Sequence, residues 1–233
     1  WTYAHDEGRK ALEKIAIKTA YKESVLDGEE AENVIAQFAE EGYDLILTTS
    51  YDFIDETIKV AEKYPNVIFG NCSGNKRAKN VFTYYGRMYQ PIYLEGIIAG
   101  KMTKTGKLGY VAPIPIPEVI RHINAFTIGA RSVNPSVKVY VSWVGAWLDP
   151  EKEKESAIEL IDAGCDIICT ECDSTSALQV AESKGVFCFG YNSDSRAFAP
   201  KSFLTAAIWD WASIYKDVIN KIKRGFKNWE KLD

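Results

Sequence analysis

Apolar and polar residues alternate along this chain with two periods, one typical of helices and one typical of buried strands. The stretch 107–150 shows both: an apolar run, Leu108–Val111, ends at a Pro-rich turn, and Pro117 then opens a segment with helical apolar spacing. Proline suits the first turn of a helix. A β-branched and aromatic run, 137–144, follows. The stretch therefore predicts a strand, a helix and a second, parallel strand.

The same alternation runs through the rest of the chain. It predicts further helices over residues 4–14, 29–40, 53–63, 90–102, 151–163, 174–184 and 211–223. Further strands are predicted within 15–25 and over 44–48, 66–69, 81–85, 166–169, 186–189 and 203–208. Such alternation is typical of an α/β fold in which helices cover both faces of parallel sheets.

A short polar stretch, 103–106, separates two such series and predicts two lobes. We expect the last helix to return to the first lobe, which gives an N-terminal lobe of residues 1–104 and 210–233 and a C-terminal lobe of residues 105–209. The first helix has no strand before it, so we expect residues upstream of Trp1.

Composition narrows the function classes. The 233 residues are 46% hydrophobic and 26% charged, with a net charge of −4 and no long basic block, so a nucleic-acid partner is not expected. No apolar run approaches the roughly 20 residues that a membrane span needs. The chain contains none of the patterns GxSxG, GxxxxGK[ST] or HExxH, and no GxGxxG follows a strand, so a binding protein is favoured over an enzyme. Asp149 and Glu118 open helices, where a carboxylate is stabilised by the helix dipole.

The cysteines and histidines give little sign of a metal site. Cys165, Cys169 and Cys172 are spaced closely enough to allow one, but cysteines in or beside an apolar strand usually act as small hydrophobes, which we favour. His5 and His122 have no second ligand at metal spacing. We expect neither a metal nor a cofactor.

Residues that directly follow the predicted strands carry the candidate chemistry, because ligands bind at the carboxyl ends of parallel strands. In the first lobe they include Trp1, Thr2, Ser50, Tyr51 and Tyr85, and in the second Trp147, Asp173, Asn192, Asp194 and Trp209. Several flat apolar faces with a few carboxylates and amides suit a planar heteroaromatic ligand.

Each of these residues also has a structural interpretation. A tryptophan can simply be packed, and Asp173, Asn192 and Asp194 can cap helices or form turns.

Several runs of the sequence resemble one known family. They are GKLGYVAPIPIPEVIRHINAFTIGARSVNP, WVGAWLDPEKE, ELIDAGCDII, FGYNSD and LTAAIWDW. They are similar to the basic membrane protein lipoproteins, which are substrate-binding proteins of ABC importers related to the purine nucleoside receptor. The resemblance implies a type I periplasmic-binding-protein fold, in which two α/β lobes close over a small ligand. It also implies a lipid-anchored, extracytoplasmic protein that works with an ABC permease and ATPase, and that meets the membrane only through an anchor outside this chain.

The resemblance bears on five residues. Trp1 and Thr2 match an aromatic-Asn pair that opens the first helix and stacks on the base, and Trp147 matches the opposing aromatic. Nucleoside binders carry an acidic ribose contact where this chain has Asn192, and a lysine where it has Trp209. Both ribose contacts are altered, so we predict a free purine base such as adenine.

Three alternatives remain open. The first is a receptor for a purine nucleoside such as guanosine, inosine or adenosine. The others are a ligand-sensing regulatory domain of the same fold and a purine-converting hydrolase.

Overall fold

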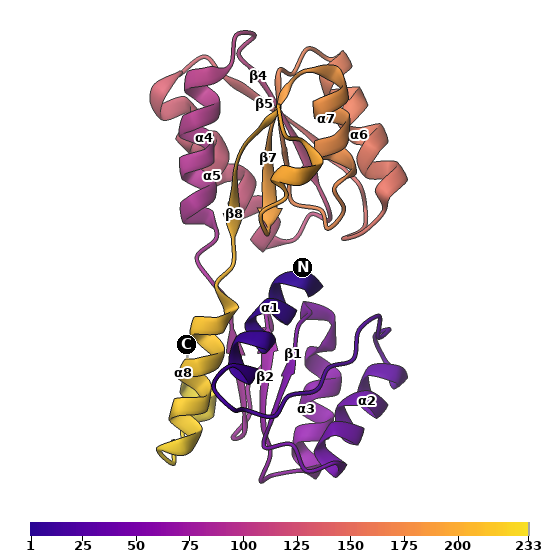
Figure 1. Ribbon diagram of the computed structural model, residues 1–233, viewed down its shortest axis with the longest axis vertical. Coiled ribbons are helices and arrows are strands. Elements are labelled where there is room, and N and C mark those ends of the chain that lie inside the picture. Colours follow the sequence, from indigo (N-terminus) through magenta and orange to yellow (C-terminus); the bar gives the residue numbers. More distant parts are fainter. Residues whose placement is uncertain (233) are drawn as a thin grey trace. The chain divides into compact units, whose positions relative to one another are not determined.

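The computed structural model describes residues 1–232, which form two compact units (Figure 1). The five-strand unit consists of Trp1 and residues 87–209, and the three-strand unit consists of residues 2–86 and the segment from Asp210 onward. The lobe boundaries drawn from the sequence remain a prediction.

The three-strand unit is built around a parallel sheet of order β1-β2-β3. Its strands are β1 (Leu45–Thr48), β2 (Ile68–Cys72) and β3 (Val81–Tyr84). Its helices are α1 (Thr2–Glu13), α2 (Glu29–Glu40), α3 (Ile54–Lys63) and α8 (Trp211–Lys223), with short 3-10 helices at Tyr51–Phe53 and Trp229–Lys231.

Helices α2 and α3 pack on this sheet through a cluster that includes Ile35, Ile46, Val60 and Phe69. Helices α1 and α8 pack on each other. The ring of His5 stacks on Trp211 with centroids 4.3 Å apart, and a Cβ added to Gly8 would lie 2.8 Å from the Cβ of Trp211. Only glycine allows the two helices to approach this closely.

The five-strand unit has a parallel sheet of order β5-β4-β6-β7-β8. Its strands are β4 (Lys107–Ala112), β5 (Lys138–Trp143), β6 (Ile167–Thr170), β7 (Phe187–Asn192) and β8 (Phe203–Ile208). Its helices are α4 (Tyr89–Met102), α5 (Pro117–Val133), α6 (Pro150–Asp162) and α7 (Ser176–Lys184), with a 3-10 turn at Arg196–Phe198. The predicted unit β4-α5-β5 is confirmed, and its two strands pair in parallel from Lys107 with Lys138 to Ala112 with Trp143.

Two apolar layers pack on the five-strand sheet, one on each face. One joins the sheet to α4 and α5 and includes Ile92, Tyr110, Phe126 and Phe189. The other joins it to α6 and α7 and includes Val111, Leu160, Ile168 and Leu178. Burial of both sheet faces explains why the strands read as continuous apolar runs rather than alternating ones.

The predicted strand within Ile15–Val25 is wrong. Residues 17–23 form an irregular connection between α1 and α2 that pairs with no strand among residues 1–232. Arg9 holds this connection instead, because its Nη1 donates to Thr19 Oγ1 at 2.8 Å and its guanidinium lies 4.8 Å from the centre of the Tyr21 ring. Strand-forming side chains are not sufficient where no neighbouring strand supplies the ladder hydrogen bonds.

The cysteines and the helices of the described residues add two further facts. All five cysteines are free thiols and are buried. Among residues 1–232 no helix is both long and apolar enough to cross a membrane.

Candidate functional site

The candidate site of the five-strand unit lies at the carboxyl ends of its strands. The β4–β5 ladder continues past the strands, because Val144 N donates to Ala112 O and Gly145 N to Pro113 O, both at 2.8 Å. Gly145 has a φ of 82° and turns the chain away from the sheet. Two residues later, the carbonyl of Trp147 accepts a bond from Asp173 N at 2.9 Å. This bond ties the loop after β5 to the loop after β6.

Asn192, the last residue of β7, is the centre of the cluster. Its Nδ2 donates to Asp173 Oδ1 at 2.9 Å, and its Oδ1 accepts from Trp209 Nε1 at 2.9 Å. Since an indole nitrogen can only donate, the Trp209 bond also fixes which way the amide points. The residue is 4% exposed and has a φ of 68°, a left-handed conformation that asparagine tolerates better than most residues. Asn192 therefore connects three loops from one buried position.

Asp173 does not cap the following helix. Helix α7 begins at Ser176 with Thr175 as its N-cap residue, so the capping alternative for Asp173 is wrong. Its carboxylate instead faces Asn192, and burial raises the pKa of Asp173 above its usual value. Because Oδ1 of Asp173 already accepts a hydrogen bond from Asn192, the group acts as an acceptor, which suits a ligand that donates a hydrogen bond.

Three tryptophans surround this polar core. The ring of Trp1 meets the ring of Trp209 edge-on, with centroids 5.9 Å apart and planes at 89°, and the Trp1 backbone nitrogen lies 3.4 Å from Asp173 Oδ1. Trp147 and Trp209 are both half-buried against the apolar layer between the sheet and α4 and α5. The fold thus brings Trp1, Asp173, Asn192 and Trp209 together. Trp147 joins this cluster through the hydrogen bond from Asp173 N to its carbonyl oxygen.

Asp194 lies apart from this cluster. Its side chain is 60% exposed, lies near Arg196 and accepts from the Arg196 backbone nitrogen at 3.1 Å. These contacts match the turn-forming alternative.

The remaining predicted residues belong to the three-strand unit and follow its strands or open its first helix. Ser50 caps the 3-10 helix after β1, because its Oγ accepts from Asp52 N at 3.3 Å. Tyr51 is 41% exposed, Tyr85 is half-buried directly after β3, and Thr2 is exposed at the start of α1. Their role in binding stays a prediction.

A buried polar network beneath the site was missed from the sequence. Glu171 directly follows β6 and is fully buried. Its Oε1 lies 2.5 Å from His122 Nδ1, and Tyr110 Oη donates to its Oε2 at 3.0 Å. Burial raises the pKa of Glu171, and the bond from His122 opposes that effect. Two signals were available: His122 itself, a polar residue three positions after Val119 on an apolar helix face, and the position of Glu171 just after the predicted strand 166–169. The network fixes the end of β6 two residues before Asp173.

Within residues 1–232 no three His, Cys, Asp or Glu side chains are arranged to hold a metal ion. Glu95 on α4 is buried, and burial raises its pKa well above the usual value.

Comparison with known proteins identifies the class that this fold and site define. Residues 1–231 match the family model of PnrA-like ABC transporter substrate-binding proteins. The chain belongs to this family, and its fold is that of the type I periplasmic binding proteins of ABC transporters.

Two curated relatives are similar over nearly all of the chain. A purine-binding protein of Brucella abortus is 45% identical over 220 residues, which are 93% of this chain and 63% of that protein. A putative ABC transporter glucose-binding protein of Haloferax volcanii is 40% identical over 99% of this chain and 59% of that protein. The chain thus spans about 60% of the length of either relative.

Solved structures show the same fold. An ABC transporter solute-binding protein from Conexibacter woesei superposes with a TM-score of 0.81 at 25% identity, covering 97% of this chain and 77% of that one. A transcriptional activator from Bacillus halodurans superposes with a TM-score of 0.85 at 23% identity, covering 97% of this chain and 79% of that one, and this likeness concerns the fold alone.

Proposed function

We propose that the protein is the solute-binding component of an ABC importer and that its ligand is a purine, preferentially a free base such as adenine. Family membership supports the transport role. The Brucella relative, named as purine-binding, supports the ligand class. Half-buried Trp147 offers a stacking face, and the carboxylate of Asp173 offers an acceptor for a ring or exocyclic N–H.

The observation that carries the preference for a free base is the bond between Trp209 and Asn192. These two residues stand where, by resemblance, nucleoside binders place a lysine and an acidic residue against the ribose. Here the indole N–H donates to Asn192 Oδ1, and the amide nitrogen of Asn192 donates to Asp173. The polar atoms of both residues are thus engaged with protein groups. A ribose whose hydroxyls lost such partners would bind about 1 to 3 kcal/mol less tightly for each buried group left unsatisfied.

The importer and its setting are part of the proposal, and family membership supports them. The partners are a permease and an ATPase, the protein acts outside the cytoplasm, and a lipid anchor outside this chain attaches it to the membrane. Stacking of the ligand between the rings of Trp1 and Trp147 completes the proposal.

A second candidate ligand is a hexose, because the Haloferax relative is named as a putative glucose-binding protein. Aromatic side chains stack on sugar rings as well as on bases. A sugar site, however, needs several donors and acceptors for hydroxyl groups, and here the amide and indole groups at the strand ends are bonded to one another.

Mass spectrometry of ligand released from the denatured full-length protein tests the proposal. Protein purified without ligand exchange should release adenine or a related purine base in near-stoichiometric amount. Release of a hexose, with no purine detected, would replace the purine proposal with the sugar candidate. Conversion of added purine nucleosides to new products would show that the protein is an enzyme rather than a binding protein.

A further inference from the structure

The core of the five-strand unit contains a polar network that the proposed function does not use. Glu171 and His122 are both fully buried, and Glu171 Oε1 lies 2.5 Å from His122 Nδ1. Tyr110 Oη donates to the other oxygen of Glu171, Oε2, at 3.0 Å. Nε2 of His122 bonds no group among residues 1–232, so Glu171 supplies the hydrogen bond that orients the ring. The network thus joins α5 and β4 to the end of β6.

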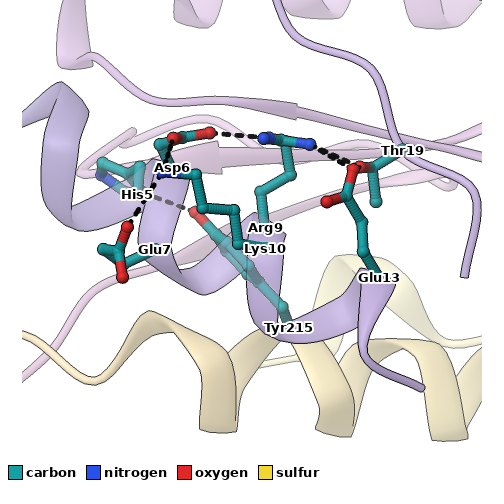
Figure 2. A network of polar contacts seen from close by, with 8 residues as sticks. All are labelled: His5, Asp6, Glu7, Arg9, Lys10, Glu13, Thr19 and Tyr215. Carbon is teal, nitrogen blue, oxygen red and sulfur yellow. Dashed lines mark hydrogen bonds and ion pairs between the residues drawn. The ribbon is translucent and has the colours of Figure 1, made fainter.

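A buried carboxylate paired with an imidazole is not an efficient source of stability. Desolvation of the two groups offsets most of their attraction, and well-packed apolar residues in the same space are often equally stable or more so. A bonded polar network instead fixes the direction of each of its groups. Burial of a histidine does not in itself call for a carboxylate, because His5 in the three-strand unit bonds a phenol, Tyr215 Oη, at 2.5 Å (Figure 2). The partner of His122 therefore points to a geometric role at the end of β6.

Glu171 anchors the loop that carries Asp173. Its backbone N donates to Val111 O of β4 at 3.1 Å, while its side chain bonds His122 on α5. The next residue, Cys172, is buried in the apolar layer on the other face of the sheet. Asp173 N then donates to the carbonyl oxygen after β5. The loop is thus held on both faces of the sheet, which leaves the Asp173 carboxylate little freedom to move.

His122 also contacts the strand that carries Asn192. The centre of its ring lies 6.4 Å from the centre of the Tyr191 ring, with the planes at 57°. Tyr191 directly precedes Asn192 in β7 and is 9% exposed. Asn192 Nδ2 in turn donates to Asp173 Oδ1 at 2.9 Å. One buried imidazole therefore supports both members of the bond between Asn192 and Asp173.

We propose that Glu171 and His122 form a positioning pair, which holds the Asp173 carboxylate in the direction that accepts a hydrogen bond from the ligand. This role rests on the proposed function, in which Asp173 accepts from an N–H group of the purine. Both side chains of the pair are fully buried, so the pair acts through Asp173 rather than by touching the ligand. Without the pair, the carboxylate spends only part of its time in the binding direction, and the apparent affinity falls by that fraction.

Four variants separate the hydrogen bond from the space that the side chains fill. His122→Leu removes the partner of Glu171, whereas His122→Asn keeps an amide nitrogen that can donate to the carboxylate. Glu171→Met removes the same bond from the other side and takes the place of His122→Leu if that variant does not fold. Leu160→Ala is the control for lost stability, because Leu160 is 4% exposed in the layer on the opposite face of the sheet.

Amide hydrogen exchange of the ligand-free, full-length protein tests the pair without any ligand. The Asp173 amide is bonded to Trp147 O and reports on the loop, and the Val144 amide, bonded in the ladder between β4 and β5, is the reference. Relative to Val144, the Asp173 amide should exchange at least about tenfold faster in His122→Leu than in the parent. In His122→Asn and Leu160→Ala it should stay within about threefold of the parent. An unchanged rate in His122→Leu, or an equal rise in Leu160→Ala, would overturn the proposal.

Calorimetric titration with adenine tests whether the pair acts through Asp173. His122→Leu should weaken adenine binding at least about tenfold, and His122→Asn should restore most of the loss. In an Asp173→Ala background, His122→Leu should cause less than about a twofold further loss, because residues that act through one group are not additive. Fully additive losses would overturn the proposal. A parent protein that binds no adenine would overturn the proposed ligand, and the exchange rates of the ligand-free protein would still decide the role of the pair.

Discussion

The indole nitrogen of Trp209 donates to the side-chain oxygen of Asn192 at 2.9 Å, and this bond joins the end of β8 to the end of β7. The same amide donates to Asp173, so one buried asparagine orients an aromatic ring and a carboxylate. Trp209 and Asn192 are the two residues that, by resemblance, differ from the ribose contacts of nucleoside binders, and they are hydrogen-bonded to each other. Their pairing is the basis of the proposed preference for a free base.

The first prediction concerns this pairing. The double variant Asn192→Asp with Trp209→Lys introduces an acidic group and an ammonium at the two positions that contact ribose in nucleoside binders. We expect the ratio of adenine affinity to adenosine affinity to fall by at least about tenfold, or about 1.4 kcal/mol, in calorimetric titrations of the full-length protein.

Trp209→Phe is the matched control, since it keeps an aromatic ring and adds no sugar contact. An unchanged ratio in the double variant, with both ligands still bound, would show that these residues do not set specificity.

The second prediction concerns stacking on Trp147. Replacing it with alanine removes one aromatic face, which is worth about 1 to 3 kcal/mol per base, so affinity should fall by about 5-fold to 150-fold. Trp147→Phe should retain most of the affinity. Trp143→Ala, at a tryptophan that is 43% exposed at the end of β5, serves as the control and should bind as the parent does. Equal affinities for Trp147→Ala and the parent would remove Trp147 from the site.

The third prediction concerns the contact between α4 and α5. A Cβ at Gly129 would lie 2.1 Å from Tyr93 O, and a Cβ at Gly96 would lie 2.1 Å from Phe126 O, so each helix presses a glycine against the backbone of the other. Backbone cannot swing aside as a side chain can. Gly129→Ala should therefore lower the free energy of unfolding by about 3 kcal/mol, measured by urea denaturation.

Ile128→Ala provides the comparison, because Ile128 is on the same helix and is 61% exposed. It should change stability by less than about 0.5 kcal/mol. A Gly129→Ala variant as stable as Ile128→Ala would contradict the close approach of the helices.

The fourth prediction concerns pH. Burial lowers the pKa of His5 from 6.5 to about 3. The unfolded chain therefore binds a proton below pH 6.5 that the folded chain resists, and stability is lost as the pH falls from 6.5 toward 3. The loss approaches about 1.4 kcal/mol per pH unit, or about 2 kcal/mol at pH 5.

His5→Phe isolates this effect, because the other titrating groups remain in both proteins. Buried Glu95 and Glu171 have raised pKa values and act with the opposite sign, so they favour the folded state as the pH falls. Unfolding at pH 7 and pH 5 should show that the parent loses about 2 kcal/mol more than the variant. Parallel pH profiles would show that His5 is accessible to protons in the folded state.

Much of the fold was predictable because helices and buried strands leave clear periodic patterns. The predicted helix 29–40 coincides with α2, and the predicted strand 203–208 coincides with β8. Strand ends were harder to predict. β2 runs from Ile68 to Cys72 rather than over 66–69, and Gly70 and Asn71 carry no strand signal. Gly70 belongs to the strand because it pairs with Leu47 and Phe82, and the position requires glycine because a Cβ there would lie 2.5 Å from the ring of Phe82.

Relationships between distant segments could not be predicted. Residues 17–23 have strand-forming side chains, yet a strand exists only with a neighbour, and none lies among residues 1–232. Position after a strand identified Asp173, Asn192 and Trp209 as candidates, but not the two hydrogen bonds among them, which join three separate loops. The contact of Glu171 with His122 was equally hidden, because the two residues are 49 positions apart in the sequence.

Calorimetric titration of the ligand-free, full-length protein with adenine and with adenosine, which differ only in the ribose, tests the central claim most directly. The bond between Trp209 and Asn192 predicts that adenine binds at least about tenfold more tightly than adenosine, a difference of about 1.4 kcal/mol. Adenosine binding as tightly as adenine, or tighter, would contradict the account.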